Sequence, residues 1–259
     1  MPETAFNHFT EDIDRAESLV DHAEYLPGIN DDERLLRSDV LRSGWMFAAG
    51  ALDAYLCDAY TWVVGAALIA KDRQPAVLLP KKLLSISLPV SAYLGHYAVN
   101  ERWRWRMAAR RMMDTRNMLN LGAVETAFNP FLPDNHKLFH DVVVAWVAAA
   151  PAKDRIFGIA PAIFAGLTPQ QKSARRHLFI DALRERFDDG IFQRRHDCIH
   201  NCDRPRISPQ RLDRAGTVRN VIRDVAFFGE QLDAHFENHF RAFLKHLGFS
   251  AATIQAAAH

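Results

Sequence analysis

"WMFAAGALDAYLCDAYTWVVGAALIA" (residues 45–70) is the stretch that decides the fold of this chain. It is long and apolar enough to resemble a membrane span, but Asp53 and Asp58 lie inside it. Each of these carboxylates would cost about 2.5–3.5 kcal/mol near the centre of a bilayer. The uninterrupted apolar piece, residues 62–70, is too short to cross one. The stretch therefore predicts a helix buried in a protein core, with no membrane contact.

Helical periodicity extends this stretch toward the N-terminus, so one helix is predicted from about residue 31 to residue 70. The segment "NDDER" (30–34) supplies capping and early acidic residues, and "KDRQP" (71–75) closes the helix. Gly44 and Gly50 are expected to let a neighbouring helix approach closely. The apolar residues that recur along the helix, and are predicted to face the core, are Leu36, Val40, Met46, Leu52, Leu56 and Val63.

The middle of the chain is also predicted to consist of helices and loops. A short helix is expected near residue 80, a basic helix over about 100–117, and an apolar helix over 136–150. The segment "NPFLPDN" (129–135) is expected to be a loop. The run "VVVAWV" inside the apolar helix has the composition of a strand, but no other segment shows the period-two alternation of a partner strand.

Thr168 as N-cap and Pro169 at the first helical position predict the start of another helix. A last long helix is expected from about residue 209 to residue 247, ending at Gly248 in a C-cap position. With no repeat, low-complexity tract or linker, the sequence predicts a single all-α domain over residues 1–259, built as a bundle of long helices. Apolar residues expected to lie inward on the helix after Thr168 are Leu178, Ile180, Leu183, Phe187 and Phe192.

Composition limits the class of protein and its compartment. The formal net charge is +1, so any basic surface for nucleic acid has to be local. Three cysteines cannot form a disulfide framework, and the odd number favours a reducing compartment. The first residues, "MPETAFNHFTEDIDRAE", lack the basic and apolar regions of a signal peptide. We therefore expect a cytoplasmic protein.

The densest group of polar residues is "RRHDCIHN" (194–201), before the proline-rich break "NCDRPRISPQ" (201–210). On a helix, His196 and His200 are i,i+4 neighbours on one face. Arg195 and His200, five positions apart, point about 140° apart on an ideal helix. One helix therefore does not direct both side chains at one atom, but a second copy across a two-fold axis can complete such a site.

This arrangement resembles the R-x(4–6)-H signature of the HEPN superfamily, in which a polar residue usually follows the arginine. Arg195 and His200 fit the spacing, and His196 takes the polar position. Arg194 also fits, so the choice between the two arginines stays open, with Arg195 preferred. The block is most similar to that of the bacterial RiboL-PSP-HEPN and MAE-type groups. The segment "LRSGWMFAAGALDAYLCD" (41–58) is similar to their early helix.

The resemblance implies a metal-independent endoribonuclease that acts on RNA as a homodimer and needs no cofactor. His200 would be the general base or general acid, and Arg195 would hold the scissile phosphate and stabilise its charge. His196 is assigned to the same catalytic group, and the residues assigned to substrate binding are Arg194, Asn201 and Arg204. By the same analogy the protein acts in phage defence or a toxin–antitoxin-like system, with an antitoxin or regulatory protein as a further partner.

Several alternatives stay open for these residues. A HEPN-like module could hold a nucleotide or a partner protein without turnover, and a plain helical interaction protein could use the same residues as a salt-bridged helix end. A zinc site from His196, Cys198, His200 and Cys202 is disfavoured, because residues two apart point to opposite sides of a helix. No metal is therefore expected at this motif.

Three further features receive mainly structural interpretations. "RWRWRMAARRMMDTR" (102–116) could contact RNA, but an exposed helix with its Met and Trp side chains in the core is favoured. A second pair with the same spacing, Arg241 and His246, lacks the polar context and is interpreted as accidental. Asp53 is expected to pair with a buried arginine, and Cys57 to lie in the core.

Overall fold

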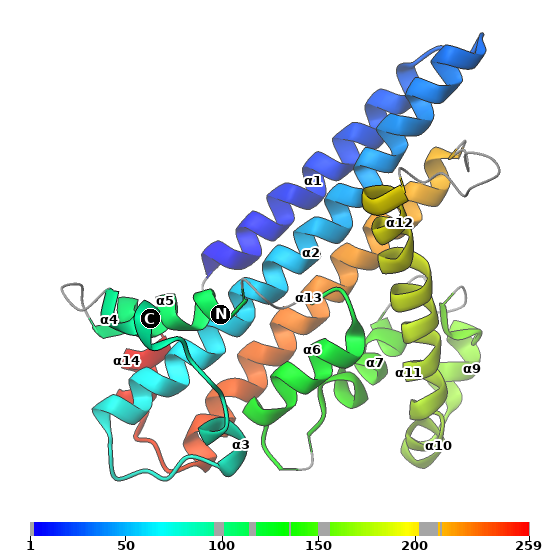
Figure 1. Cartoon of the computed structure of the whole chain (residues 1–259). Helices are drawn as coiled ribbons and strands as arrows, with labels where there is room; N and C mark the ends of the chain where they lie inside the picture. The colour runs from blue at the N-terminus through cyan, green and yellow to red at the C-terminus, as the bar shows by residue number, and fades with distance from the viewer. Residues whose placement is uncertain are drawn as a thin grey trace.

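The computed structural model of the chain describes residues 3–95, 101–113, 118–134, 136–149, 156–201, 212 and 214–258. Within these ranges the regular elements are helices and no strand occurs, so the fold is all-α, as the sequence predicted. Three long helices form its axis: α1 (Glu3–Tyr25), α2 (Asp31–Arg73) and α13 (Ala215–His246). The first two form an antiparallel hairpin, and α13 lies along both of them (Figure 1).

Helix α2 begins at the predicted residue and ends slightly beyond the predicted end. The side chain of Asn30 accepts a hydrogen bond from the Glu33 backbone N–H at 2.9 Å, which caps the first turn. Lys71 and Arg73 lie in the last turn, where cations interact favourably with the helix dipole. A helix of 43 residues is about 65 Å long. It contacts α1, α13 and several of the shorter elements, namely α5, α6, η2, α12 and α14.

The burial of α2 changes along its length. Leu36 was predicted to face the core, but it is 53% exposed. The reason is its position at the tip of the α1–α2 hairpin, which extends beyond the body of the protein (Figure 1). By length and composition α2 could cross a membrane, yet 72% of its most apolar window is buried in the protein, as in a core helix. The other predicted core positions are partly or fully buried: Val40, Met46, Leu52, Leu56 and Val63.

The two glycines of α2 differ in their surroundings. A Cβ at Gly44 would lie 3.1 Å from Cγ2 of Val20 and 3.2 Å from the carbonyl oxygen of Ala16, so the backbone of α1 does approach closely there. A Cβ at Gly50 would meet no described atom within 4 Å. The predicted close approach at Gly50 is therefore wrong.

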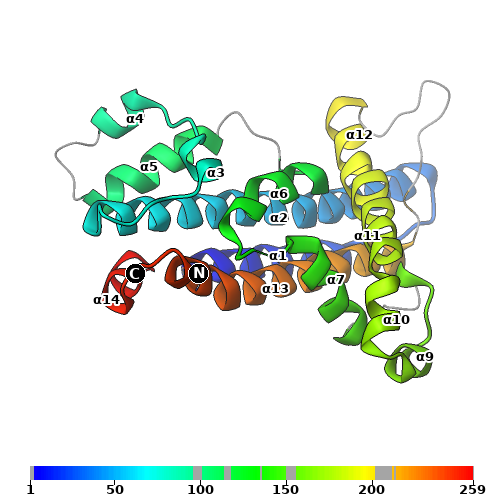
Figure 2. The ribbon, with the colours of Figure 1, turned by 90° about the horizontal axis from the view of Figure 1, so that it is seen from below.

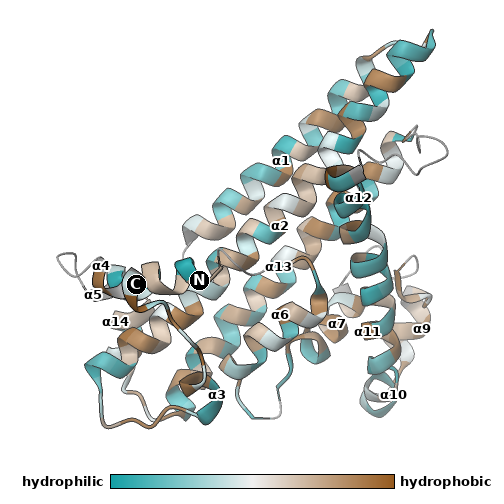
Figure 3. Cartoon of the chain, in the orientation of Figure 1, coloured by the Kyte–Doolittle hydropathy of each residue, from teal (hydrophilic) through white to brown (hydrophobic). Residues whose placement is uncertain are grey.

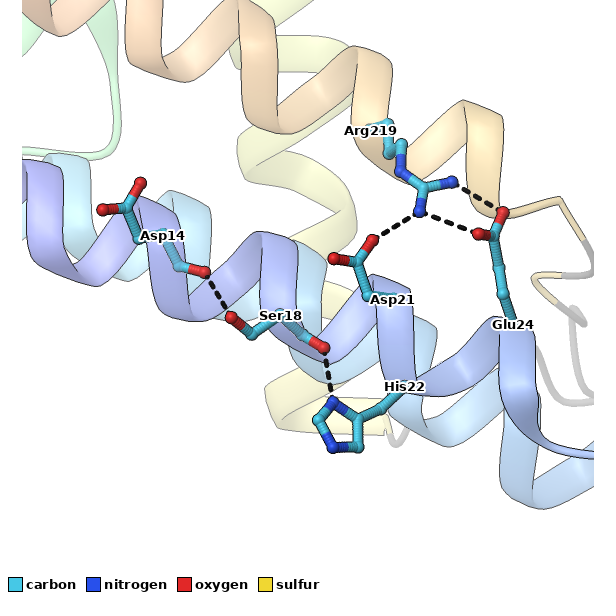
Figure 4. A network of polar contacts seen from close by, with 6 residues as sticks. All are labelled: Asp14, Ser18, Asp21, His22, Glu24 and Arg219. Atoms are coloured by element: carbon cyan, nitrogen blue, oxygen red, sulfur yellow. Dashed lines mark hydrogen bonds and ion pairs between the residues drawn. The ribbon is translucent and has the colours of Figure 1, made fainter.

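Helix α1 was not predicted from the sequence. From Phe9 onward its buried residues are spaced alternately by four and three, which forms one continuous apolar stripe toward α2. Near its C-terminal end, Arg219 of α13 donates hydrogen bonds to Asp21 at 2.5 Å and to Glu24 at 2.6 and 2.8 Å (Figure 4). These contacts fasten the end of α1 to the start of α13. The stripe consists of Phe9, Ile13, Ala16, Val20 and Ala23.

Shorter helices surround this axis. Figure 2 shows α3 to α6 on one side of α2, whereas α11 and α12 cross the long helices near one end. Figure 3 shows mainly hydrophilic residues on α10 and α11, which form part of the surface. The shorter elements are α3 (Lys81–Leu84), α4 (Val90–Gly95), α5 (Glu101–Met113), α6 (Leu121–Phe128), η1 (Asn129–Phe131), α7 (Leu138–Ala149), α9 (Pro161–Gly166), α10 (Pro169–Ala174), α11 (Arg176–Arg184), η2 (Glu185–Phe192), α12 (Gln193–Asn201) and α14 (Ala251–Ala258).

The predicted helix after Thr168 is present but divided. Thr168 and Gln171 form a capping box, as the start signal indicated. The helix then divides at Arg175 into α10 and α11 and becomes π-helical at η2. Leu178 was predicted to face the core, but it is 55% exposed, so this prediction is wrong. The division of the helix changes the face that α11 turns to the core. The other four predicted side chains are buried: Ile180, Leu183, Phe187 and Phe192.

The last long helix starts later than predicted. Leu212 and Arg214 are not helical, and α13 begins at Ala215 rather than near residue 209. Its end agrees with the prediction, because Gly248 has a φ of +96° and donates its N–H to the Lys245 carbonyl. Helices α6 and α14 were not predicted, and α6 is followed directly by η1 inside the expected loop 129–135.

Candidate functional site

The π-helical segment η2 positions the motif helix α12. Its hydrogen bonds include one from the Gln193 backbone N–H to the carbonyl of Asp188, five residues earlier. Such geometry is rare and is found frequently at functional sites. Because η2 runs directly into α12, the conformation of η2 sets the direction in which the motif side chains point.

Three polar contacts hold η2 in place. The indole N–H of Trp45 in α2 donates to the carbonyl of Ile191 at 3.1 Å. Asp188 accepts a hydrogen bond from the first backbone N–H of α6 at 2.8 Å. Arg186 forms an ion pair with Asp224 of α13 at 2.7 Å, and that carboxylate is almost fully buried. The base of α12 is therefore fastened to three separate helices.

The two arginines of the motif are half-buried toward α2. The guanidinium of Arg194 lies 5.4 Å from the ring centroid of Trp45, within range of a cation–π interaction. Arg195 lies near Asp53 of α2. Burial raises the pKa of the Asp53 carboxyl, and the Arg195 charge and a hydrogen bond from the Met118 backbone partly offset this rise. One oxygen of Asp53 is buried without a hydrogen-bond partner among the described residues. The charge of Arg195 acts on Asp53, and the pairing of Asp53 with a buried arginine stays a prediction.

The two histidines of the motif face solvent. His196 and His200 are both exposed, and their ring centroids are 4.3 Å apart, so they share one helix face as predicted. Cys198 is buried on another side of α12, which agrees with the argument against a zinc site built from alternating residues. Of the residues assigned to substrate binding, Arg204 and the side chain of Asn201 lie outside the described part of the chain. So does Cys202.

The basic helix α5 has both buried and exposed features. Met112 and Met113 are buried, as the structural interpretation required, and the indole N–H of Trp105 is hydrogen-bonded to Asp72. Trp103, in contrast, is 47% exposed. With Arg106 it lines a groove of about 240 Å³ between α1, α2 and α5. Arg110, also at this groove, forms an ion pair with Asp58.

A second group of histidines was not singled out in the sequence. His136 and Asp141, at the start of α7, are joined by a hydrogen bond of 2.9 Å. The ring of His239 in α13 lies 4.6 Å from that of His136, and 4.3 Å from that of His235. We call these four residues the His–Asp cluster. Part of it was visible as a signal, because "HFENH" (235–239) places two histidines four apart, which puts them on one helix face.

Burial controls the charge of this cluster. His235 is only 7% exposed, and burial followed by the proximity of His239 lowers its pKa to about 4. Burial also lowers the pKa of His239. Both imidazoles are therefore predominantly neutral at pH 7. The Nε2 atom of His235 is buried without a hydrogen-bond partner in the described structure.

Comparisons with protein-family models, with curated proteins and with solved structures find no match to this chain. The HEPN resemblance therefore depends on two segments of the sequence, the motif at 194–201 and the early helix at 41–58, and it stays a prediction. Arg241 and His246, the second pair with this spacing, are both exposed on α13. They provide a matched control for the motif within the same molecule.

Proposed function

We propose that this chain is a HEPN-type endoribonuclease whose site is built on α12. The observation that carries the proposal is the pair of exposed imidazoles at His196 and His200, preceded by two arginines on a helix that η2 holds in place. Exposed imidazoles are available for proton transfer, and the guanidiniums supply positive charge for a phosphate. We further propose that the protein acts in the cytoplasm, in phage defence or a toxin–antitoxin-like system.

The proposed reaction uses only groups of the protein and the RNA. The imidazole of His200 takes the proton of a ribose 2′-OH, and the 2′ oxygen attacks the adjacent phosphorus. The bond from phosphorus to the 5′ oxygen breaks, and that oxygen receives a proton from an acidic group such as a protonated imidazole. The products are a 2′,3′-cyclic phosphate and a 5′-hydroxyl. Arg195 stabilises the charge that develops on the phosphate.

A homodimer is part of the proposal because of the directions of these side chains. Arg195 lies toward α2, near Asp53, whereas His200 is exposed to solvent. Two copies of α12 facing each other would place the arginine of one near the histidine of the other. Sedimentation of the purified chain tests this step, and a strictly monomeric protein that cleaves RNA would contradict it.

Incubation of the full chain with single-stranded RNA and excess EDTA tests the proposed function. We expect cleavage to continue in EDTA, with cyclic phosphate at the 3′ end of the products. His200→Ala should reduce the rate by about 10²–10⁴-fold, the range of general acid–base catalysis. His246→Ala, in the matched pair on α13, should leave the rate unchanged.

The outcomes separate the alternatives. RNA binding that depends on Arg195 without any cleavage would replace the nuclease with a HEPN-like binding module. Cleavage that EDTA abolishes would indicate a metal-dependent nuclease. Equal loss in His200→Ala and His246→Ala would show that the motif has no special role. A protein that neither binds nor cleaves RNA would be a helical interaction protein.

A further inference from the structure

The His–Asp cluster brings ligand atoms from two parts of the chain to one place. One ligand atom each from His136, Asp141 and His239 lies within 4.8 Å of the other two. In a tetrahedral zinc site with ligand bonds of 2.0–2.1 Å, neighbouring ligand atoms are about 3.3 Å apart. An ion bound at this place requires side-chain rotations that bring the more distant ligand atoms closer together. All three residues are partly buried, so they remain accessible to an ion from solvent.

The backbone that carries these residues is held firmly. The backbone N–H of His136 donates to the carbonyl of Pro133 at 3.1 Å. Two residues later, the N–H of Leu138 donates to the side chain of Asn129 at 2.9 Å. On the opposite side, α13 is fixed by buried aromatic residues next to His239, including Phe236, whose ring stacks on that of Phe128 at 4.5 Å. The ligand atoms thus approach one another on a rigid support.

His235 adds an independent observation. Its side chain is more than nine-tenths buried, its ring lies 4.3 Å from that of His239, and its Nε2 atom has no partner among the described residues. His136, Asp141 and His239 are the charged or titratable groups that influence it. A buried polar atom normally has a partner in a native protein, so this atom indicates that the cluster holds something further.

We propose that the His–Asp cluster binds one divalent transition-metal ion of the zinc type, with His136, Asp141 and His239 as ligands. The ion would take the place of the proton that now joins His136 to Asp141, since their 2.9 Å separation is close to that of two ligands on one ion. His235 is the fourth group of the cluster, as a hydrogen-bond partner of a water bound to the ion. The ion would join the segment at the start of α7 to the C-terminal part of α13.

The donor set determines the class of ion. Two imidazoles with a single carboxylate suit Zn²⁺ and its first-row neighbours. Mg²⁺ and Ca²⁺ prefer sites whose ligand atoms are all oxygen. In this cluster most of the ligand atoms are imidazole nitrogens.

Titration with Co²⁺ as a visible probe, followed by competition with Zn²⁺, tests the proposal on the full chain after treatment with EDTA and dialysis. We expect one Co²⁺ per chain with an absorption spectrum of a four-coordinate ion, displacement by Zn²⁺, and no displacement by Mg²⁺. His239→Gln and Asp141→Asn should each weaken binding by about 100-fold or more, at least the upper end of the loss seen when outer-shell partners are removed. Bound Zn²⁺ should also raise the melting temperature.

The matched control is His200→Gln, because His196 and His200 have the same spacing and ring separation as His235 and His239. This variant should bind Co²⁺ as the wild type does. Far-UV circular dichroism checks that each variant folds. If His239→Gln disturbs folding, His136→Gln, at a partly exposed position, tests the site in its place. Equal affinity in the wild type, His239→Gln and His136→Gln, or no binding by the wild type, would overturn the proposal.

The metal proposal is independent of the proposed nuclease activity. Its ligands lie on α13 and at the start of α7, whereas the nuclease residues lie on α12. His239→Gln should therefore lose metal binding and keep RNA cleavage, and His200→Ala should do the reverse. Loss of both properties in both variants would contradict two separate sites.

Discussion

Two pairs of histidines in this molecule have the same spacing and nearly the same geometry. His196 and His200 on α12 and His235 and His239 on α13 are each four residues apart, and in both pairs the ring centroids are 4.3 Å apart. Their surroundings differ completely. The α12 pair is exposed and follows two arginines, whereas the α13 pair is buried or half-buried beside Asp141.

In both pairs the four-residue spacing along the helix sets the distance between the two rings. The neighbouring charged residues and the burial determine which ligand each pair favours. Positive charge next to exposed imidazoles favours an anion such as a phosphate and disfavours a metal cation. A carboxylate next to buried imidazoles favours a cation. In the sequence, the α12 pair is a candidate for zinc although its arginines oppose a cation, whereas the α13 pair was not singled out. The predictions below test whether the two pairs differ in this way.

The largest expected effect concerns the arginines that distinguish the α12 pair. Arg195→Ala should reduce RNA cleavage by about 10²–10³-fold, the usual loss when one stabilising donor is removed from a developing charge. Arg194→Ala should reduce it by less than about tenfold, because that guanidinium lies over Trp45. Initial cleavage rates measure both. Arg241→Ala is the control, and a greater loss in Arg194→Ala than in Arg195→Ala would exchange their roles.

The second prediction concerns pH and the buried member of the α13 pair. The pKa of His235 is about 6.5 in the unfolded chain, and burial lowers it to about 4 in the folded chain. The unfolded state therefore binds more protons between these values, and the folded state loses stability as the pH falls from 6.5 to 4. The full loss is about 3 kcal/mol. His136, Asp141 and His239 are the other titratable groups that face His235.

Urea unfolding in EDTA at several pH values measures this effect. His235→Gln should make the free energy of unfolding less dependent on pH in this range, with the difference growing toward pH 4. Identical pH profiles for the wild type and His235→Gln would show that His235 is not held neutral by its surroundings, and would weaken the contrast between the two pairs.

The third prediction concerns the contact that holds α12. Trp45→Phe removes the indole N–H that donates to the Ile191 carbonyl. A buried acceptor left without a donor costs about 1–3 kcal/mol in the free energy of unfolding. RNA cleavage should fall as well, because η2 then holds α12 less firmly, whereas Co²⁺ binding should not change. A parallel loss of Co²⁺ affinity would mean that the two regions are coupled.

The smallest expected effect concerns the exposed pair itself. His196→Ala and His200→Ala should each change the free energy of unfolding by less than about 0.5 kcal/mol, because exposed side chains away from special contacts contribute little. Urea unfolding at pH 7 measures this. A loss above about 1 kcal/mol in either variant would show that the α12 pair has a structural role.

Much of the fold could be predicted from local patterns. The capping residues of α2 and α10 and the glycine after α13 were visible, because these signals depend on neighbours in sequence. Helix α1 was not predicted, although the alternating spacing of its apolar residues was present in the sequence. The π-helical geometry of η2 was not predicted, because the contacts that hold this segment come from α2, α6 and α13.

The candidate sites show the same limit. The shared face of His196 and His200 follows from one helix and was predicted. The position of Arg195 near Asp53 depends on how α12 packs against α2, so only the type of partner could be anticipated. His136 and His239 are far apart in the chain, and no periodicity joins them. Only the spacing of His235 and His239 indicated that cluster in advance.

The π-helical segment η2 has one further consequence for the α12 motif. In an α-helix each residue adds a rotation of about 100°, so inserting or deleting one residue turns everything that follows by that angle. Substitutions within 185–192 that restored α-helical geometry without changing the number of residues would therefore rotate the exposed imidazoles about the helix axis, without changing any residue of the motif. The eight residues of η2 therefore set the rotational phase of α12, and with it the exposure of its histidines to solvent.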